Sequence, residues 1–422
     1  MTRLLIAILA LLAIALPAHA QSEAQLDQRA ADVVAVLRGE AAYGEVFTPA
    51  FTAAVPQAQF ASIGTQLSEA YGALVGLESV TPSGTLGAAT ITIRFERALA
   101  SGPIQLEYTA PYRVAGLRLN DFAPVNDAGL SVVEQVQALP GATSILFARL
   151  DGSAVVASHN ATRQMAVGST FKLYVLSALS RSIARGEHSW DEVVPLTERS
   201  FPSGQMQEWP RGTPVTLQTL ATMMIAISDN TATDQLIAVL GREAVEAELF
   251  ASGHGNPAAT LPFLTTRELF LLKLGEDGVL REYEAGDTAA RRAILGGLQG
   301  STLNMADVQR VFGPGPRFID IEWFASAADL ARIYARLADD PVALAILSIN
   351  LGTDRSHFAA WDYVGYKGGS EPGVLNFSWL LRDAEGAYWV LTMSWNDPAA
   401  VVSEVQFLGL AQAVLGEARS TQ

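Results

Sequence analysis

A serine and a lysine three residues apart form the first candidate for a catalytic pair. Ser169 and Lys172 stand at the start of an apolar run, Phe171–Leu176, that predicts a buried helix. At this spacing the hydroxyl and the amine lie on one helix face, within hydrogen-bond reach. A serine at a helix N-terminus also has unpaired backbone N–H groups beside it, which could bind an oxyanion. The pattern predicts a nucleophilic serine with a lysine base, although a capping serine beside a surface lysine would give the same residues.

The scarcity of lysine adds weight to this pair. Among the 28 basic residues only three are lysines, Lys172, Lys273 and Lys367, and the rest are arginines. Arginine stays protonated under ordinary conditions, whereas a buried lysine can lose its proton and act as a base. Lys172 and Lys367 lie in short motifs, so we expect them to do chemistry. Lys273 lies in no motif, and we expect its replacement by arginine to have no effect.

A Ser-Asp-Asn motif forms the second candidate. It follows an apolar helix expected over residues 217–227, and its members are Ser228, Asp229 and Asn230. Taken alone, these residues are best explained as a helix end followed by an Asx turn. The motif becomes informative only together with the others.

The third candidate lies near the C-terminus, where a strand expected at residues 364–367 ends in Lys367. Gly368, Gly369 and Ser370 follow directly. Glycines just after a strand let a substrate approach the backbone and leave N–H groups exposed. A strand-end turn with a solvated lysine explains this segment equally well.

The order of the three motifs resembles that of the penicillin-recognising serine hydrolases, and in particular the class A β-lactamases, which carry S-x-x-K, S-D-N and K-T-G. The resemblance covers about residues 139–415. It implies that Ser169 is the acylated nucleophile and that Lys172 accepts its proton.

The same resemblance assigns roles to the other two motifs. Ser228 would pass a proton to the leaving amine, and Lys367 would hold the substrate carboxylate. Asn230 would bind the amide side chain of the substrate. Gly369 and Ser370 would line the substrate site, and the backbone N–H of Ser370 would form the oxyanion hole together with that of the nucleophile.

Two departures from the family pattern affect the expected reaction. Class A enzymes carry a Glu on the loop after S-D-N that activates the deacylating water, but residues 251–264 hold no carboxylate. We therefore expect slow deacylation, with Glu268, the nearest later acid, as the candidate replacement. Gly368 stands in place of the Thr of K-T-G, which removes a hydroxyl that Ser370 could supply.

The region around the motifs predicts strands at both ends with helices between them. The expected elements are a hairpin at residues 143–158, helices starting near Thr216, Thr266 and Ser326, strands at 377–381 and 388–395, and an amphipathic helix at 401–415. We expect the first and last strands to pair in an antiparallel sheet packed against a helical block. This is the α/β arrangement of the β-lactamase/transpeptidase fold.

The N-terminal region predicts a separate domain. Apolar residues recur at helical spacing over residues 25–77 and alternate over residues 85–122, which indicates helices followed by antiparallel strands. We expect a small α+β domain at 21–122, a linker at 123–138 and the hydrolase domain at 139–422. The first domain resembles the steroid-isomerase-like (NTF2-like) cone that precedes a β-lactamase-like domain in a protein of the clavulanic acid gene cluster.

Residues 1–20 predict a secretory signal peptide. Arg3 precedes an apolar stretch at residues 4–16, and Ala18-His19-Ala20 provides a small-x-small cleavage site. We therefore expect an exported protein, periplasmic or secreted, without a stable membrane anchor.

The composition excludes several classes of function. A net charge of −15 argues against nucleic acid or anionic lipid as a partner. The absence of cysteine excludes a thiol nucleophile and Cys-ligated metals, and the 5 histidines are scattered. We expect a monomer without metal or cofactor that acts on a small molecule: a serine hydrolase acting weakly on β-lactams, on small esters, or on both. A D,D-peptidase-like penicillin-binding protein and a small-ligand binder with a vestigial hydrolase domain remain alternatives.

Overall fold

The chain folds into two compact units that divide at residues 127 and 128. The computed structural model describes residues 18–126, 129–298, 300–313 and 315–417. The expected signal peptide at residues 1–20 lies outside the described residues, except for its last three, which belong to the first helix. No helix within these described ranges is long and apolar enough to cross a membrane.

The first unit has its helices before its sheet, as the periodicity predicts. The helices are α1 (Ala18–Leu37), α2 (Tyr43–Val46), α3 (Pro49–Ala54) and α4 (Gln57–Tyr71). The strands are β1 (Leu74–Pro82), β2 (Ala88–Phe95), β3 (Ala98–Leu106), β4 (Val114–Leu117) and β5 (Asp121–Pro124). They form an antiparallel sheet in the order β1-β2-β3-β4, with β5 also paired to β3.

The alternation in the sequence produces the buried face of this sheet. Ile91, Ile93 and Phe95 on β2 are buried, whereas the residues between them are more exposed. Helix α1 packs against β1 and β2. The resemblance of this unit to NTF2-like domains stays a prediction.

Both ends of the segment expected to be the linker, residues 123–138, are folded. Its first residues belong to β5 of the first unit, and its last residues form helix α5 (Val132–Gln137) of the second. Ser131 and Glu134 form a capping box that starts α5.

A five-stranded antiparallel sheet forms the centre of the second unit. Its strands are β6 (Ala142–Arg149), β7 (Val155–His159), β12 (Tyr363–Glu371), β13 (Val374–Arg382) and β14 (Tyr388–Asn396), in the order β12-β13-β14-β6-β7. Leu146 of β6 lies opposite Thr392 of β14. The predicted pairing of the first and last strands is therefore confirmed, and β12, which carries the third motif, is an edge strand.

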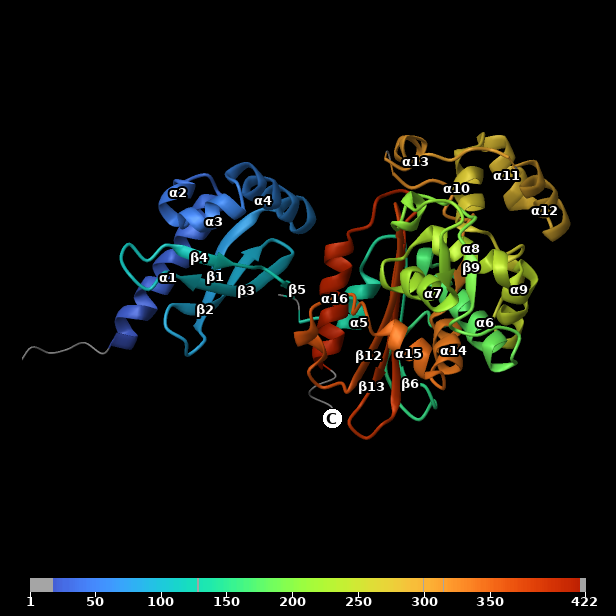
Figure 1. Cartoon of the computed structure of the whole chain (residues 1–422). Coiled ribbons are helices and arrows are strands. Elements are labelled where there is room, and N and C mark those ends of the chain that lie inside the picture. The colour runs from blue at the N-terminus through green and yellow to red at the C-terminus, as the bar shows by residue number, and fades with distance from the viewer. Residues whose placement is uncertain (1–17, 127–128, 299, 314, 418–422) are drawn as a thin grey trace, which may run out of the picture. The chain divides into compact units, whose positions relative to one another are not determined.

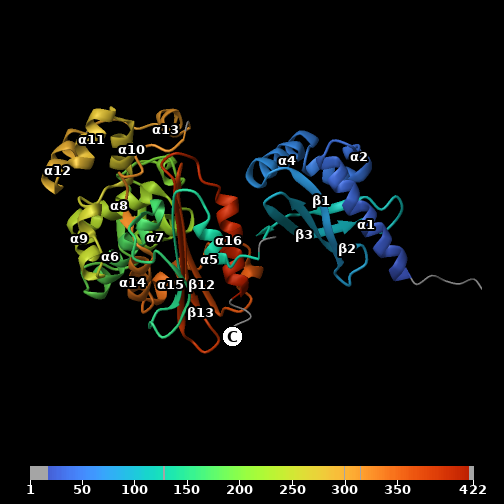
Figure 2. The same ribbon diagram turned by 180° about the vertical axis from the view of Figure 1, so that it is seen from behind.

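Helices cover both faces of this sheet (Figures 1 and 2). One face packs against α5 and α16 (Glu404–Glu417), around buried residues that include Trp379 and Phe407. The other face packs against the helical block, whose core contains residues of α6 and α14. The helices of the block are α6 (Lys172–Ala184), α7 (Leu217–Ala226), α8 (Asn230–Leu240), α9 (Arg242–Ala251), α10 (Thr266–Leu274), α11 (Asp277–Ala285), α12 (Thr288–Gly297), α13 (Met305–Phe312), α14 (Ala327–Leu337) and α15 (Pro341–Leu347).

Two short ladders, one of three residue pairs and one of two, complete the unit. Strands β9 (Val193–Pro195) and β10 (Pro214–Thr216) pair with each other, and β8 (Met165–Ala166) pairs with β11 (Phe324–Ala325). The second of these ladders matters for the site, because it ties the segment before Ser169 to the segment that follows residue 323.

Candidate active site

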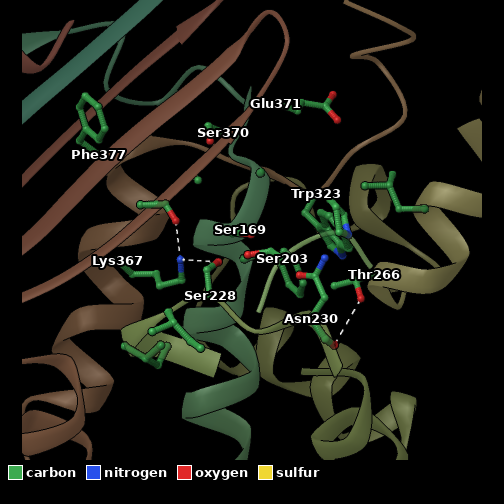
Figure 3. A pocket seen from close by; sticks show the side chains of 18 of the residues that line it. Ser169, Ser203, Ser228, Asn230, Thr266, Trp323, Lys367, Ser370, Glu371 and Phe377 are labelled. Atoms are coloured by element: carbon green, nitrogen blue, oxygen red, sulfur yellow. Dashed lines mark hydrogen bonds between the residues drawn. The ribbon is translucent and has the colours of Figure 1, made fainter. Parts of the chain in front are cut away.

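The predicted site residues converge on a cavity of about 460 Å³. The cavity is lined by the turn before α6, by the segments around α7 and α10, and by β12 (Figure 3). Six of the seven predicted residues line it: Ser169, Ser228, Asn230, Lys367, Gly369 and Ser370. The seventh, Lys172, is fully buried and hydrogen-bonded to two of the lining residues.

Two glycines bring the nucleophile turn and strand β12 into direct contact. Ser169 lies in a short 3-10 turn, Gly168–Phe171, immediately before α6. A Cβ on Gly369 would lie 2.1 Å from the carbonyl oxygen of Val167 and 2.5 Å from the backbone nitrogen of Ser169. Gly168 has a φ of +48°, and a Cβ there would lie 2.9 Å from the backbone nitrogen of Ser370. The N–H groups of Ser169 and Ser370 are therefore carried by backbone segments in contact, as a two-donor oxyanion hole requires.

Lys172 is surrounded by acceptors from the Ser-Asp-Asn turn. Its Nζ donates to the carbonyl oxygen of Ser228 at 2.7 Å, to Ser228 Oγ at 3.0 Å and to Asn230 Oδ1 at 2.8 Å. Among the hydrogen bonds of the described residues, none joins Lys172 to Ser169. The amine is thus held through the second motif, and its expected hydrogen bond to the nucleophile is not formed in this state.

Ser228 connects the two lysines. Its Oγ accepts from Lys172 Nζ at 3.0 Å and from Lys367 Nζ at 3.1 Å. Its backbone has a φ of +57°, a conformation that costs free energy in a residue with a side chain. The strained turn between α7 and α8 places this hydroxyl between both amines.

Burial shifts the charge state of both amines. The pKa of Lys172 lies well below its usual value, mainly because burial disfavours the ammonium and also because the positive charge of Lys367 is close. Burial alone lowers the pKa of Lys367 to about 7. A neutral amine, which can accept a proton from a hydroxyl, is therefore available near neutral pH.

The other two members of the second motif hold the turn in place. The buried carboxylate of Asp229 caps α8 through the backbone N–H of Ala232 and accepts from the N–H groups of Gln205 and Met206 at 2.6 and 2.8 Å. Asn230 accepts from Lys172 and donates from Nδ2 to the carbonyl oxygen of Phe201 at 3.0 Å. An amide NH₂ carries two donors, and among the described residues only one of those of Asn230 is hydrogen-bonded.

Gly368 replaces the threonine of K-T-G, and the side chain of Tyr366 occupies the space that a threonine side chain would fill. A Cβ on Gly368 would lie 2.1 Å from the hydroxyl oxygen of Tyr366, two residues earlier on the same strand face. Tyr366 also lines the cavity. The phenol hydroxyl of Tyr366 therefore lies where the side chain of the K-T-G threonine would begin. The motif alone did not reveal this replacement of one hydroxyl by another.

Glu268 is the wrong candidate for a replacement carboxylate. It forms a capping box with Thr265 at the start of α10, and its Oε1 pairs with Arg242 at 2.6 Å. Glu268 is not among the residues that line the cavity. Both of its carboxylate oxygens are used in holding α10.

Three other glutamates line the cavity instead, Glu322, Glu371 and Glu404, and the first two of them lie beside the third lysine. Glu322 and Glu371 are lining residues, and Lys273 Nζ lies 3.5 Å from Glu322 Oε1 and 2.5 Å from Glu371 Oε1. Lys273 is fully buried. This burial removes the basis of the expectation that replacement by arginine has no effect, because a bulkier cation would have to enter a closed, ion-paired position. The unexplained third lysine was the one sequence signal for this cluster.

Within the residues that the structure describes, no cluster of three or more His, Asp or Glu side chains could hold a metal ion. The polar groups of the cavity are instead hydroxyls, amines, backbone N–H groups and carboxylates, which suit acyl and proton transfer.

Comparison with known proteins gives one family match. Residues 131–341 match the model of the beta-lactamase enzyme family, a stretch that contains the first two motifs. No curated protein sequence matches the chain.

Solved structures show likenesses over about 69% of the chain. A β-lactamase from Sphaerobacter thermophilus DSM 20745 is 20% identical, with a TM-score of 0.46, covering 69% of this chain and 96% of that one. A β-lactamase from Francisella tularensis is 12% identical, with a TM-score of 0.49, covering 69% and 100%. A class A β-lactamase from Mycobacterium abscessus is 16% identical, with a TM-score of 0.48, covering 69% and 100%.

Proposed function

Because the chain belongs to the beta-lactamase enzyme family, we propose that it is a serine hydrolase in which β-lactams or small esters acylate Ser169. The observation that carries the proposal is the position of Ser228 Oγ between two buried amines, 3.0 Å from Lys172 Nζ and 3.1 Å from Lys367 Nζ. A hydroxyl held in this way can relay a proton between a nucleophile and a leaving group.

Acylation begins when Ser169 Oγ attacks the carbonyl carbon of the substrate. The neutral amine of Lys172 takes the serine proton, after exchanging one of its three hydrogen bonds for one to Ser169. The N–H groups of Ser169 and Ser370 stabilise the oxyanion of the tetrahedral intermediate. Ser228 then donates its proton to the leaving nitrogen or oxygen, and Lys172 restores the proton of Ser228 through the hydrogen bond between them.

Lys367 recognises an anionic group of the substrate. A carboxylate within about 4–6 Å stabilises the ammonium form, so binding of an anionic substrate raises the pKa of Lys367 from about 7 and fixes its charge. Ser370 and Tyr366, which both line the cavity, add hydroxyl donors to the same anion.

Two alternatives are weaker on the same observations. A vestigial domain that only binds a ligand would have no reason to keep Lys172 and Lys367 buried, since burying an amine beside another costs free energy. A D,D-peptidase-like penicillin-binding protein would use the same acylation groups. It would differ in the rate at which water removes the acyl group.

Hydrolysis assays with a matched variant test the proposal. Wild-type protein should open the ring of a chromogenic cephalosporin or cleave a small aryl ester, and Ser169→Ala should lose this activity while keeping its thermal unfolding midpoint. Equal activity in the two proteins would show that Ser169 is not the nucleophile. Inactivity of the wild type towards both substrates would contradict the proposed function.

Export, a monomeric state and an NTF2-like first domain belong to the same proposal. They are supported by the pattern of residues 1–20, by the family, and by the order of helices and antiparallel strands in the first unit. Sequencing the N-terminus of the protein recovered outside the cytoplasm should show Gln21 as the first residue. An N-terminus at Met1 would contradict export by cleavage.

A further inference from the structure

A second cluster of ionisable side chains, separate from the motifs, borders the cavity that contains Ser169. Its members are Lys273 on α10, Glu322 just before β11, and Glu371 at the end of β12. The Lys273 Nζ atom lies 2.5 Å from Glu371 Oε1 and 3.5 Å from Glu322 Oε1. The exposed fraction of the side chain is 0% for Lys273, 1% for Glu322 and 8% for Glu371.

The charges of this cluster do not balance unless it holds a proton. One buried ammonium compensates one carboxylate, and a second ionised carboxylate would be buried without a cation of its own, although the backbone N–H of Trp323 donates to Glu322 Oε2 at 3.1 Å. The pKa of Glu322 is raised to about 8, mainly by burial and then by the negative charge of Glu371, against the opposing effect of Lys273. The two carboxyl groups therefore share one proton near neutral pH, so the pair contains one ionised member and one protonated member.

Both carboxyl groups are attached to segments that touch the nucleophile turn. Glu371 directly follows Ser370, whose backbone nitrogen lies beside Gly168. Trp323, next to Glu322, stacks on Phe171 with the ring centroids 3.7 Å apart and an interplanar angle of 14°. Figure 3 shows Trp323 and Glu371 on the side of Ser169 away from Lys367.

We propose that Glu322 and Glu371 form the proton-accepting pair that activates water to hydrolyse the Ser169 acyl-enzyme, with Lys273 positioning both. This inference rests on the proposed function, since it needs an acyl group on Ser169. The geometry that carries it is that both carboxyl groups lie on the wall of the cavity that contains Ser169. Lys273 can neutralise only one of the two.

The proposed step balances in atoms and protons. The ionised carboxylate takes a proton from water as the water oxygen bonds to the acyl carbon. The bond between that carbon and Ser169 Oγ then breaks. Oγ takes a proton from the carboxyl pair, directly or through Lys172, and a carboxylic acid leaves. The pair returns to its starting proton count, and no oxidant, metal or cofactor is consumed.

This inference changes the expected rate of deacylation, which the sequence of the loop at residues 251–264 predicts to be slow. That loop holds no carboxylate, which predicts a persistent acyl-enzyme. A carboxyl pair from two distant segments would supply the missing base, and the acyl-enzyme would then turn over.

The test separates acylation from deacylation in Glu322→Gln and Glu371→Gln. Intact-protein mass spectrometry after mixing with a penicillin gives the rate at which the adduct forms and, after removal of excess penicillin, the rate at which it disappears. We expect adduct formation within about threefold of wild type and disappearance slowed by roughly 10²–10⁴-fold, the range for loss of a general base. Glu385→Gln, which changes an exposed carboxylate in the turn between β13 and β14, is the matched control and should behave as wild type.

A further variant tests the positioning role of Lys273. Lys273→Met should slow the disappearance of the adduct and leave its formation unchanged, whereas a purely structural lysine would affect both. If a Gln variant does not fold, Glu322→Asp replaces it, because the shorter side chain keeps the charge but withdraws the carboxylate. Disappearance at the wild-type rate in folded Glu322 and Glu371 variants would overturn the inference and leave the proposed function intact. A wild type that forms no adduct would refute the proposed function, and the inference with it.

Discussion

Replacing Lys172 by arginine keeps a positively charged hydrogen-bond donor at this position but removes the neutral amine that can accept a proton. Lys172 is fully buried and donates to three acceptors from Ser228 and Asn230. A guanidinium can also donate to these acceptors, but it cannot lose its proton in a protein. Loss of a general base slows a reaction by roughly 10²–10⁴-fold, which corresponds to about 3–5 kcal/mol of activation free energy at 1.36 kcal/mol per factor of ten.

The fold also has to accommodate the longer side chain of Lys172→Arg. Overpacking of a closed site costs about 1–3 kcal/mol, so urea unfolding should show a stability loss of this order. Lys172→Met avoids the added bulk and also lacks the base, so both variants should lose acylation while only the first is overpacked.

The assay is the first-order rate of adduct formation at saturating penicillin, measured by intact mass. Control measurements on Asp191→Asn, an exposed carboxylate of the helical block far from the motifs in sequence, should match wild type. Acylation by folded Lys172→Arg within threefold of wild type would refute the assignment of Lys172 as the base.

Three further variants test other parts of the site. Lys273→Arg should lower the free energy of unfolding by about 1–3 kcal/mol because the site is closed, and unchanged urea unfolding would show that it is not. The pKa of Lys367 is about 7 in the folded protein and near 10.4 in the unfolded chain. Between these two pH values the unfolded chain binds more protons than the folded protein, so the contribution of Lys367 to the free energy of unfolding rises with pH across that range. The stability of wild type relative to Lys367→Met should accordingly increase from pH 7 to pH 10, and a flat difference would contradict the lowered pKa. Gly368→Thr, which restores the residue of K-T-G, should reduce acylation because its Cβ would collide with the hydroxyl of Tyr366, and Tyr366→Ala should relieve that loss; higher activity in Gly368→Thr alone would exclude the collision.

The sequence predicted the parts of the site that lie in local motifs. Ser169, Ser228 and Lys367 each sit at the junction of a predicted helix or strand with a turn, and the structure brings them to one cavity. Their convergence follows from the fold, because a predicted strand, which the structure places at the edge of the sheet, meets the start of one predicted helix and the end of another there. The order of the motifs was enough to indicate this arrangement.

The parts that were missed depend on long-range packing. Glu322 and Glu371 belong to no motif, and 49 residues separate Lys273 from one and 98 from the other. Nothing in their local sequence indicates that they meet, because their approach depends on how α10 and the segment before β11 pack against β12. The role of Glu268 was misjudged for a different reason, which is local: a Thr-x-x-Glu spacing forms a capping box where a helix begins, and α10 begins there.

The central claim is that Ser169 is the residue acylated by a β-lactam, and peptide mapping of the penicillin adduct tests it most directly. Wild-type protein should gain the full mass of the penicillin, since ring opening releases no fragment, and the added mass should lie on the peptide that contains Ser169. Ser169→Ala, which leaves Lys172, Ser228 and Lys367 in place, should gain no mass under the same conditions. Absence of any adduct on wild type, or an adduct of equal yield on Ser169→Ala, would contradict the account.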